Sequence, residues 1–129
     1  MIRLAILLAI LATPASANVR EMVKDTAKRH NVPPRLALAV ADVESRFQCH
    51  ARSRAGARGV MQVMPRTARG VGVHGNLFDC KVGAEAGMRY LSAIIRQHGV
   101  SCASISLYNR GAHARPVCTS YGRKVLSRM

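Results

Sequence analysis

Apolar residues recur at intervals of three and four along most of the chain after residue 18, and this spacing predicts short amphipathic helices. Proline and glycine interrupt the pattern, and Asp or Ser stands where several of the segments would be capped. In the first segment the apolar residues on one face are Val19, Met22, Val23 and Ala27. The expected helices cover residues 18–30, 34–47, 65–70, 80–98, 102–110 and 120–126.

The helix expected over residues 80–98 is the longest. Asp79 can cap its start, and Gly99 can end it. Gly83 and Gly87, four residues apart, would allow a neighbouring helix to approach closely. The expected buried stripe consists of Val82, Ala86, Tyr90, Ile94 and Ile95.

The segment CHARSRAGARGVMQVMP (49–65) lacks helical spacing. Gly56 and Gly59 interrupt it, and GVMQVM favours a loop with a short extended piece. We therefore predict a mostly α fold: a small single domain of short helices with one loop or short extended hairpin segment.

The first 17 residues have the pattern of a secretory signal peptide. Arg3 supplies a positive start, LAILLAILA is a short apolar run, and ASA ending at Ala17 offers a cleavage site. The apolar run is well short of the ~20 residues that a membrane-spanning helix needs. We expect cleavage after Ala17, export to the periplasm, a single mature domain over 18–129 and no stable membrane insertion.

The chain contains four cysteines, and an even number in a small exported domain predicts two disulfides. A zinc site is the alternative, but the sequence has no C-x-x-C motif and its five histidines are scattered. We predict no metal site and no cofactor. The cysteines are Cys49, Cys80, Cys102 and Cys118.

The composition is strongly basic, with 20 Lys and Arg against 6 Asp and Glu and a formal net charge of +14. Such a charge predicts an anionic partner, although an Arg-rich genome would produce the same bias. Nucleic acid is disfavoured, because the chain has no Trp, two Phe and three Tyr, and stacking on bases requires exposed aromatics. Anionic lipid, wall polymers or a glycan with acidic peptide stems fit an exported protein better.

One of the few acidic residues stands in an apolar helix. Glu44 follows RLALAVADV, and the residues three, four, seven and eight positions before it are apolar, so it lies on or beside the buried stripe. A carboxyl group in such surroundings loses hydration and its pKa rises, which suits a general acid. A structural Glu paired with a base such as Arg46 is the alternative, and helix position alone favours it.

Motifs downstream of Glu44 change that preference. In order and spacing they resemble the lytic transglycosylases with a soluble lytic transglycosylase-type catalytic domain, of the lysozyme-like superfamily. The resemblance runs from about residue 20 to about residue 126. The matching blocks are Glu44-Ser45, Phe47, Ser53, Gly56-Ala57, GVMQVMPRTA (59–68), GMRYL (87–91) and YNRG (108–111).

The resemblance implies that Glu44 is the single catalytic carboxylate. It would protonate the bond oxygen between N-acetylmuramic acid and N-acetylglucosamine in peptidoglycan, and then deprotonate the muramoyl 6-hydroxyl to give a 1,6-anhydro product. A typical hydrolase needs a second carboxylate. Among the other acids only Asp79 stays open as such a partner. They are Glu21, Asp25, Asp42, Asp79 and Glu85.

The resemblance also implies five substrate contacts. Gln62 would bind the sugar acetamido group, Met64 would pack against a sugar face, and Ser53 would place a hydroxyl near the scissile bond. Tyr108 would hydrogen-bond Glu44 or the acetamido carbonyl, and Asn109 would orient the loop or the substrate. Without the resemblance, Met64 and Tyr108 fit an ordinary core role as well.

The sequence departs from the family pattern at three places. Arg110 replaces a small residue, and would add a cation to the cleft rim or crowd it. Cys80 and Gly83 replace the usual Pro and Asn at the start of the helix over 80–98. Spacing leaves three disulfide pairings open. The pairs that we predict are Cys49–Cys80 and Cys102–Cys118.

A small dedicated member of this family would act as a monomer on peptidoglycan strands. Its expected setting is a secretion or conjugation apparatus, or wall turnover. The alternative is a non-catalytic or hydrolytic (muramidase) cationic cell-wall-binding protein.

Overall fold

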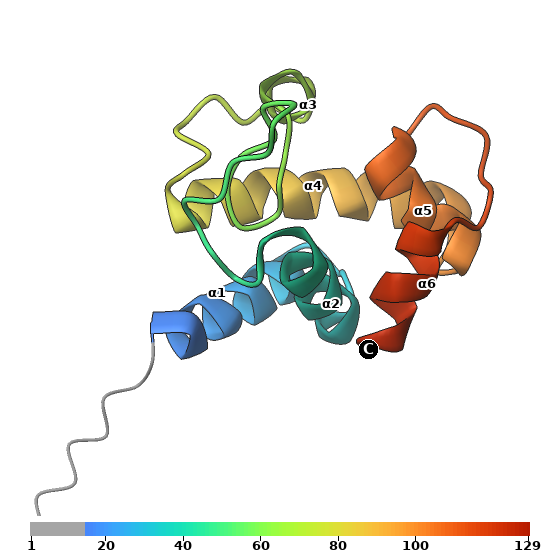
Figure 1. Cartoon of the computed structure of the whole chain (residues 1–129), viewed down its shortest axis with the longest axis horizontal. Coiled ribbons are helices and arrows are strands. Elements are labelled where there is room, and N and C mark those ends of the chain that lie inside the picture. The colour runs from blue at the N-terminus through green and yellow to red at the C-terminus, as the bar shows by residue number, and fades with distance from the viewer. Residues whose placement is uncertain (1–14) are drawn as a thin grey trace, which may run out of the picture.

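The computed structural model describes residues 15–129, which form a helical domain (Figure 1). The predicted mostly α fold is confirmed, and each expected helix is present within a few residues of its predicted bounds. Within residues 15–129, no helix is both long and apolar enough to cross a membrane. The helices are α1 (Ala15–Arg29), α2 (Pro34–Ser45), α3 (Pro65–Gly70), α4 (Cys80–His98), α5 (Cys102–Arg110) and α6 (Ser120–Ser127).

The start of α1 differs from the sequence-based expectation. The helix begins at Ala15, three residues before the predicted start at residue 18. Most of the expected signal peptide, residues 1–14, lies outside the described residues, so cleavage after Ala17 stays a prediction.

The longest helix, α4, runs through the middle of the domain and contacts α1, α3 and α5 (Figure 1). The predicted stripe of this helix is partly wrong, because Val82, Tyr90 and Ile95 are only half-buried. Ala86 and Ile94 of the predicted stripe are buried, and the other three pack at the edge of the core. The buried residues of the helix are Gly83, Ala84, Ala86, Gly87, Met88, Leu91, Ser92 and Ile94.

Small residues on α4 face a loop, contrary to the expectation that a helix would approach there. A Cβ atom added to Gly87 would lie 2.4 Å from the Cβ of Met61, and one added to Gly83 would lie 2.6 Å from the carbonyl oxygen of Leu77. Only glycine leaves room for the Met61 side chain at position 87 and for the Leu77 carbonyl at position 83. The loop that follows α2 therefore packs directly on α4, with Met61 fully buried.

The loop between α2 and α3 contains the short extended pieces that the sequence predicts. Single antiparallel bridges join Arg52 to Arg58 and Arg58 to Val63. The disulfide Cys49–Cys80 ties this loop to the start of α4. Backbone hydrogen bonds within the loop, such as those from the N–H of Ser53 to the carbonyl oxygen of Ala57 (3.0 Å) and from the N–H of Gly59 to the carbonyl oxygen of Ala51 (2.9 Å), also hold its shape.

Both predicted disulfide pairs are confirmed. Besides the bridge at the start of α4, Cys102–Cys118 joins the start of α5 to the segment before α6. Gly122 of α6 packs closely on α5, since an added Cβ would lie 2.3 Å from the Oγ of Ser106. These contacts position α6 against the rest of the domain.

Two predicted caps are confirmed as well. The carboxylate of Asp79 accepts hydrogen bonds from the backbone N–H groups of Lys81 and Val82. Ser101 and Ser104 form a capping box at the start of α5. Asp79 is thus occupied in stabilising a helix terminus.

Candidate active site

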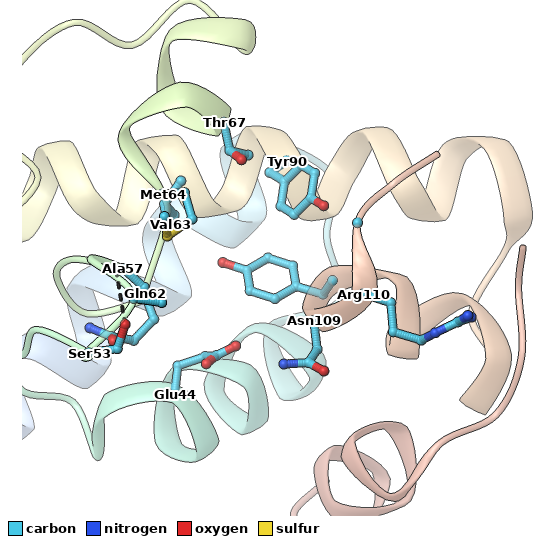
Figure 2. Close-up of a pocket in the computed structure, with 13 residues that line it drawn as sticks. Glu44, Ser53, Ala57, Gln62, Val63, Met64, Thr67, Tyr90, Asn109 and Arg110 are labelled. Atoms are coloured by element: carbon cyan, nitrogen blue, oxygen red, sulfur yellow. Dashed lines mark hydrogen bonds between the residues drawn. The ribbon is translucent and has the colours of Figure 1, made fainter. Parts of the chain in front are cut away.

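A cleft with a volume of about 460 Å³ lies between the end of α2, the loop over residues 53–64, Tyr90 of α4 and the end of α5. All six residues predicted for the site line this cleft, and Figure 2 shows those it labels around one hollow. They are Glu44, Ser53, Gln62, Met64, Tyr108 and Asn109. The lining also includes Ala55, Ala57, Val63, Thr67, Tyr90, Arg110 and Gly111.

Glu44 lies in the last turn of α2. The helix ends at Ser45, two residues before the predicted end, because Arg46 and Phe47 have left-handed backbone angles (φ 52° and 62°). The Ser45 hydroxyl donates to the carbonyl oxygen of Val60 at 2.7 Å and so attaches the helix end to the cleft loop. The sharp turn buries Phe47 and leaves Glu44 half-buried at the cleft.

The carboxyl group of Glu44 has the property that its helical position predicted. Burial raises its pKa from 4.5 to about 7, even though a hydrogen bond from Tyr121 and the charge of Lys124 act in the lowering direction. Near neutral pH the group is therefore divided between its acid and base forms. The alternative of an ion pair with Arg46 is wrong, because the described structure contains no such pair.

Tyr121 is a site residue that sequence reasoning missed. Its hydroxyl donates a hydrogen bond of 2.8 Å to Oε2 of Glu44, across 77 positions of sequence. The sequence places Tyr121 only within the helix expected over residues 120–126. No local pattern reveals a contact that depends on how α6 packs beside α2 and α5.

Tyr108 lines the cleft but does not bond to Glu44. Its buried hydroxyl donates to the carbonyl oxygen of Met61 at 2.7 Å. Its ring centroid lies 5.2 Å from that of Tyr90. Tyr108 therefore supports the cleft loop and one wall of the cleft, and Tyr121 holds the carboxylate.

Gln62 and Ser53 are arranged by bonds to the loop backbone. The amide nitrogen of Gln62 donates to the carbonyl oxygens of Ala51 and Gly59, both at 2.9 Å. This leaves the amide oxygen as the end that can accept a bond from a ligand. The Ser53 hydroxyl accepts from the N–H of Ala57 at 3.0 Å and can still donate its own hydrogen.

Met64 and Asn109 are the exposed members of the predicted set. Met64 is 40 % exposed, in contrast to the fully buried Met61. Asn109 is exposed at the end of α5. An exposed thioether and an exposed amide in one cleft offer apolar and polar contacts to a large ligand.

Glu44 is the one carboxylate that lines the cleft in the described part of the chain. The other acids that form contacts do so elsewhere. Asp42 pairs with Arg128 at 2.7 Å. Burial would raise the pKa of Glu85, but hydrogen bonds from His30 and Arg89 outweigh it and lower the pKa. Asp79 caps α4, so it is not the second carboxylate of the cleft.

The sequence matches the transglycosylase SLT domain family over residues 21–122. This chain belongs to that family. It is 38 % identical over 112 residues to membrane-bound lytic murein transglycosylase C of Actinobacillus pleuropneumoniae, covering 72 % of this chain and 30 % of the relative. The protein of the same name from Glaesserella parasuis is 33 % identical over 111 residues, with the same coverage of both chains. This chain thus spans less than a third of these relatives.

Solved structures support the fold. An inactive Glu-to-Gln mutant of the lytic transglycosylase Slt from Pseudomonas aeruginosa has a TM-score of 0.73 and 25 % identity, covering 84 % of this chain and 23 % of that one. The soluble lytic transglycosylase of 70 kDa from Escherichia coli has a TM-score of 0.65 and 24 % identity, over 84 % and 18 % of the chains. The predicted lysozyme-like architecture of the SLT family is confirmed.

Proposed function

We propose that this chain is a peptidoglycan lytic transglycosylase in which Glu44 acts first as the acid and then as the base. One observation carries the proposal: Glu44 is the one carboxylate lining the cleft among residues 15–129, and burial raises its pKa to about 7. A carboxyl group that titrates near the working pH can serve both roles. The family and the names of the relatives support the same substrate class.

In the first step the protonated carboxyl of Glu44 donates its proton to the glycosidic oxygen between N-acetylmuramic acid and N-acetylglucosamine. The bond from C1 to that oxygen breaks, and N-acetylglucosamine leaves with a hydroxyl group. The positive charge left on the muramoyl ring is close to the newly formed carboxylate. The Tyr121 hydroxyl steadies that carboxylate through its hydrogen bond.

In the second step the carboxylate of Glu44 takes the proton from the 6-hydroxyl of the muramoyl unit. The freed oxygen bonds to C1 and closes the 1,6-anhydro ring, so Glu44 is protonated again and no water is consumed. The amide oxygen of Gln62 accepts from the acetamido N–H, and the exposed side chain of Met64 packs on a sugar face. Ser53 and Asn109 supply further polar contacts.

The proposal includes a location. Two disulfides favour an oxidising compartment, in agreement with the expected signal peptide. The proposed setting is the periplasm, with glycan strands as substrate. A monomeric state and a role beside a secretion or conjugation apparatus stay predictions.

Purified sacculi test the assignment of the acid. Glu44→Gln keeps the shape of the side chain but carries no transferable carboxyl proton, so release of soluble muropeptides should fall at least about a hundredfold. Asp42→Asn is the matched control, since Asp42 lies on the same helix and pairs with Arg128. Circular dichroism should show both variants folded.

Three results would count against the proposal. Activity that survives in Glu44→Gln would place the chemistry elsewhere. Equal losses in both variants would indicate a general effect of altering α2. Binding to sacculi without any release by the unmodified chain would leave a cell-wall-binding protein.

A further inference from the structure

Two charged side chains line the cleft within the described residues, Glu44 and Arg110. Arg110 is the last residue of α5. Figure 2 shows its side chain pointing away from Glu44, beyond Asn109. Proton transfer at Glu44 does not require a cation at this end of the cleft. Arg110 is therefore placed to contact another part of the ligand.

Arg110 is anchored, yet most of its donors are available. Its Nη1 donates to the carbonyl oxygen of Arg115, in the loop between α5 and α6. The disulfide Cys102–Cys118 holds the far end of that loop. A guanidinium group has five N–H donors, so this bond leaves the others for a ligand.

No carboxylate of the described chain neutralises Arg110, since the ion pairs among residues 15–129 involve other cations. Its neighbour Asn109 is exposed and lines the same cleft. A guanidinium beside an amide is suited to bind a carboxylate, and the planar fork of arginine binds both carboxylate oxygens at once.

The chemistry of the proposed substrate limits where such a carboxylate can be. The sugar backbone of a peptidoglycan strand is neutral, because the lactyl carboxyl of each muramoyl unit is amide-linked to a peptide stem. The free carboxylates are on the stems. A cation at the end of the cleft, away from the acid that acts on the sugar linkage, is placed for a stem.

We propose that Arg110 is a specificity-determining residue that binds a stem-peptide carboxylate, so that the cleft selects strands carrying peptide stems over bare glycan. This inference rests on the proposed function of the cleft. The alternative is a purely structural role. Arg110 bonds to the loop between α5 and α6, and its charge lies at the C-terminal end of α5, where the helix dipole favours a cation. Loss of a stem-binding residue would slow cleavage only of strands with stem carboxylates, whereas loss of a structural residue would slow cleavage of every strand.

The test uses soluble glycan strands in three forms: with intact stems, with the stem carboxylates chemically amidated, and with the stems removed by an amidase and the freed lactyl carboxyls then amidated. Initial rates are measured for the full chain and for Arg110→Ala, Arg110→Gln and Arg110→Lys. Arg96→Ala is the matched control, since Arg96 is an exposed arginine of α4 that is not part of the cleft.

We expect Arg110→Ala and Arg110→Gln to lower kcat/KM on intact strands about five- to tenfold, mainly through KM, as loss of an exposed charge-assisted contact predicts. On amidated and stripped strands these variants should match the unmodified chain. Arg110→Lys should keep part of the preference, because it keeps the charge without the fork. Arg96→Ala should change none of the rates.

Equal losses on all three substrates would overturn the inference in favour of a structural role, and unchanged rates on intact strands would overturn it outright. If Arg110→Ala does not fold, the comparison of Arg110→Lys with Arg110→Gln gives the same decision, because both retain a group that can donate to Arg115. Failure of the proposed function has a different result, namely no cleavage of any form by the unmodified chain.

Discussion

At the scale of single residues, the groups around the Glu44 carboxyl shift its pKa in opposite directions. Burial raises the pKa of Glu44, while the Tyr121 hydroxyl and the Lys124 charge lower it, and the result is about 7. The sequence indicated the first influence, because apolar residues precede Glu44 at helical spacing. It did not indicate the other two, because both residues belong to α6, far along the chain.

Replacing Tyr121 tests this balance. A hydrogen bond to a carboxylate favours the charged form, so Tyr121→Phe should raise the pKa of Glu44 above 7. Activity that requires protonated Glu44 is lost as pH rises through that pKa, and the alkaline limb of the pH–rate profile should move to higher pH. The overall rate should fall about tenfold or more, because the carboxyl loses its orientation.

The measurement is the rate of muropeptide release between about pH 5 and pH 9. Lys124→Ala is the companion variant, and it should shift the limb in the same direction without removing the hydrogen bond. A limb that stays in place, or moves to lower pH, in Tyr121→Phe would contradict the role assigned to Tyr121.

At the scale of elements, the prediction from sequence was strongest where the structure is locally determined. The helices over 65–70, 80–98 and 102–110 have the bounds that their caps and stops predicted. The prediction was weaker where an element packs against a segment that is remote in the sequence. The glycines of α4 do form a close-approach site, but no helix packs there: Gly87 meets Met61 of the cleft loop, and Gly83 meets Leu77 of the segment before α4.

Gly87 therefore connects the core to the cleft. An alanine at this position would place its Cβ 2.4 Å from the Cβ of Met61 and force the loop outward. We expect Gly87→Ala to lower the free energy of unfolding by about 1–3 kcal/mol, as overpacking does. It should also raise KM, because Gln62 and the carbonyl that accepts from Tyr108 move with Met61.

Thermal or urea unfolding with parallel kinetics checks this prediction. Gly70→Ala is the control, because apart from its chain neighbours and its own helix backbone no atom lies within 4 Å of where its Cβ would be. It should leave both stability and KM unchanged. Equal stability of the Gly87→Ala variant and the unmodified chain would contradict the packing described for α4.

At the scale of the whole molecule, the cleft is assembled from segments that are distant in sequence: the end of α2, the loop over 53–64, one residue each of α3 and α4, and the end of α5. Its six predicted residues were found through the resemblance of ordered motifs to a known family. Helical periodicity alone favoured a structural ion pair for Glu44. The hydrogen bond from Tyr121 to Glu44 and the bonds of Gln62 and Tyr108 to the backbone depend on tertiary packing. Helical periodicity contains no information about them.

If Glu44 acts alone, as we propose, the strand is cleaved by ring closure and not by water. Sacculi are digested in water enriched in heavy oxygen, and the released muropeptides are analysed by mass spectrometry. The account predicts 1,6-anhydromuramoyl ends that contain no heavy oxygen. Reducing ends that carry the heavy isotope would contradict it and identify a muramidase.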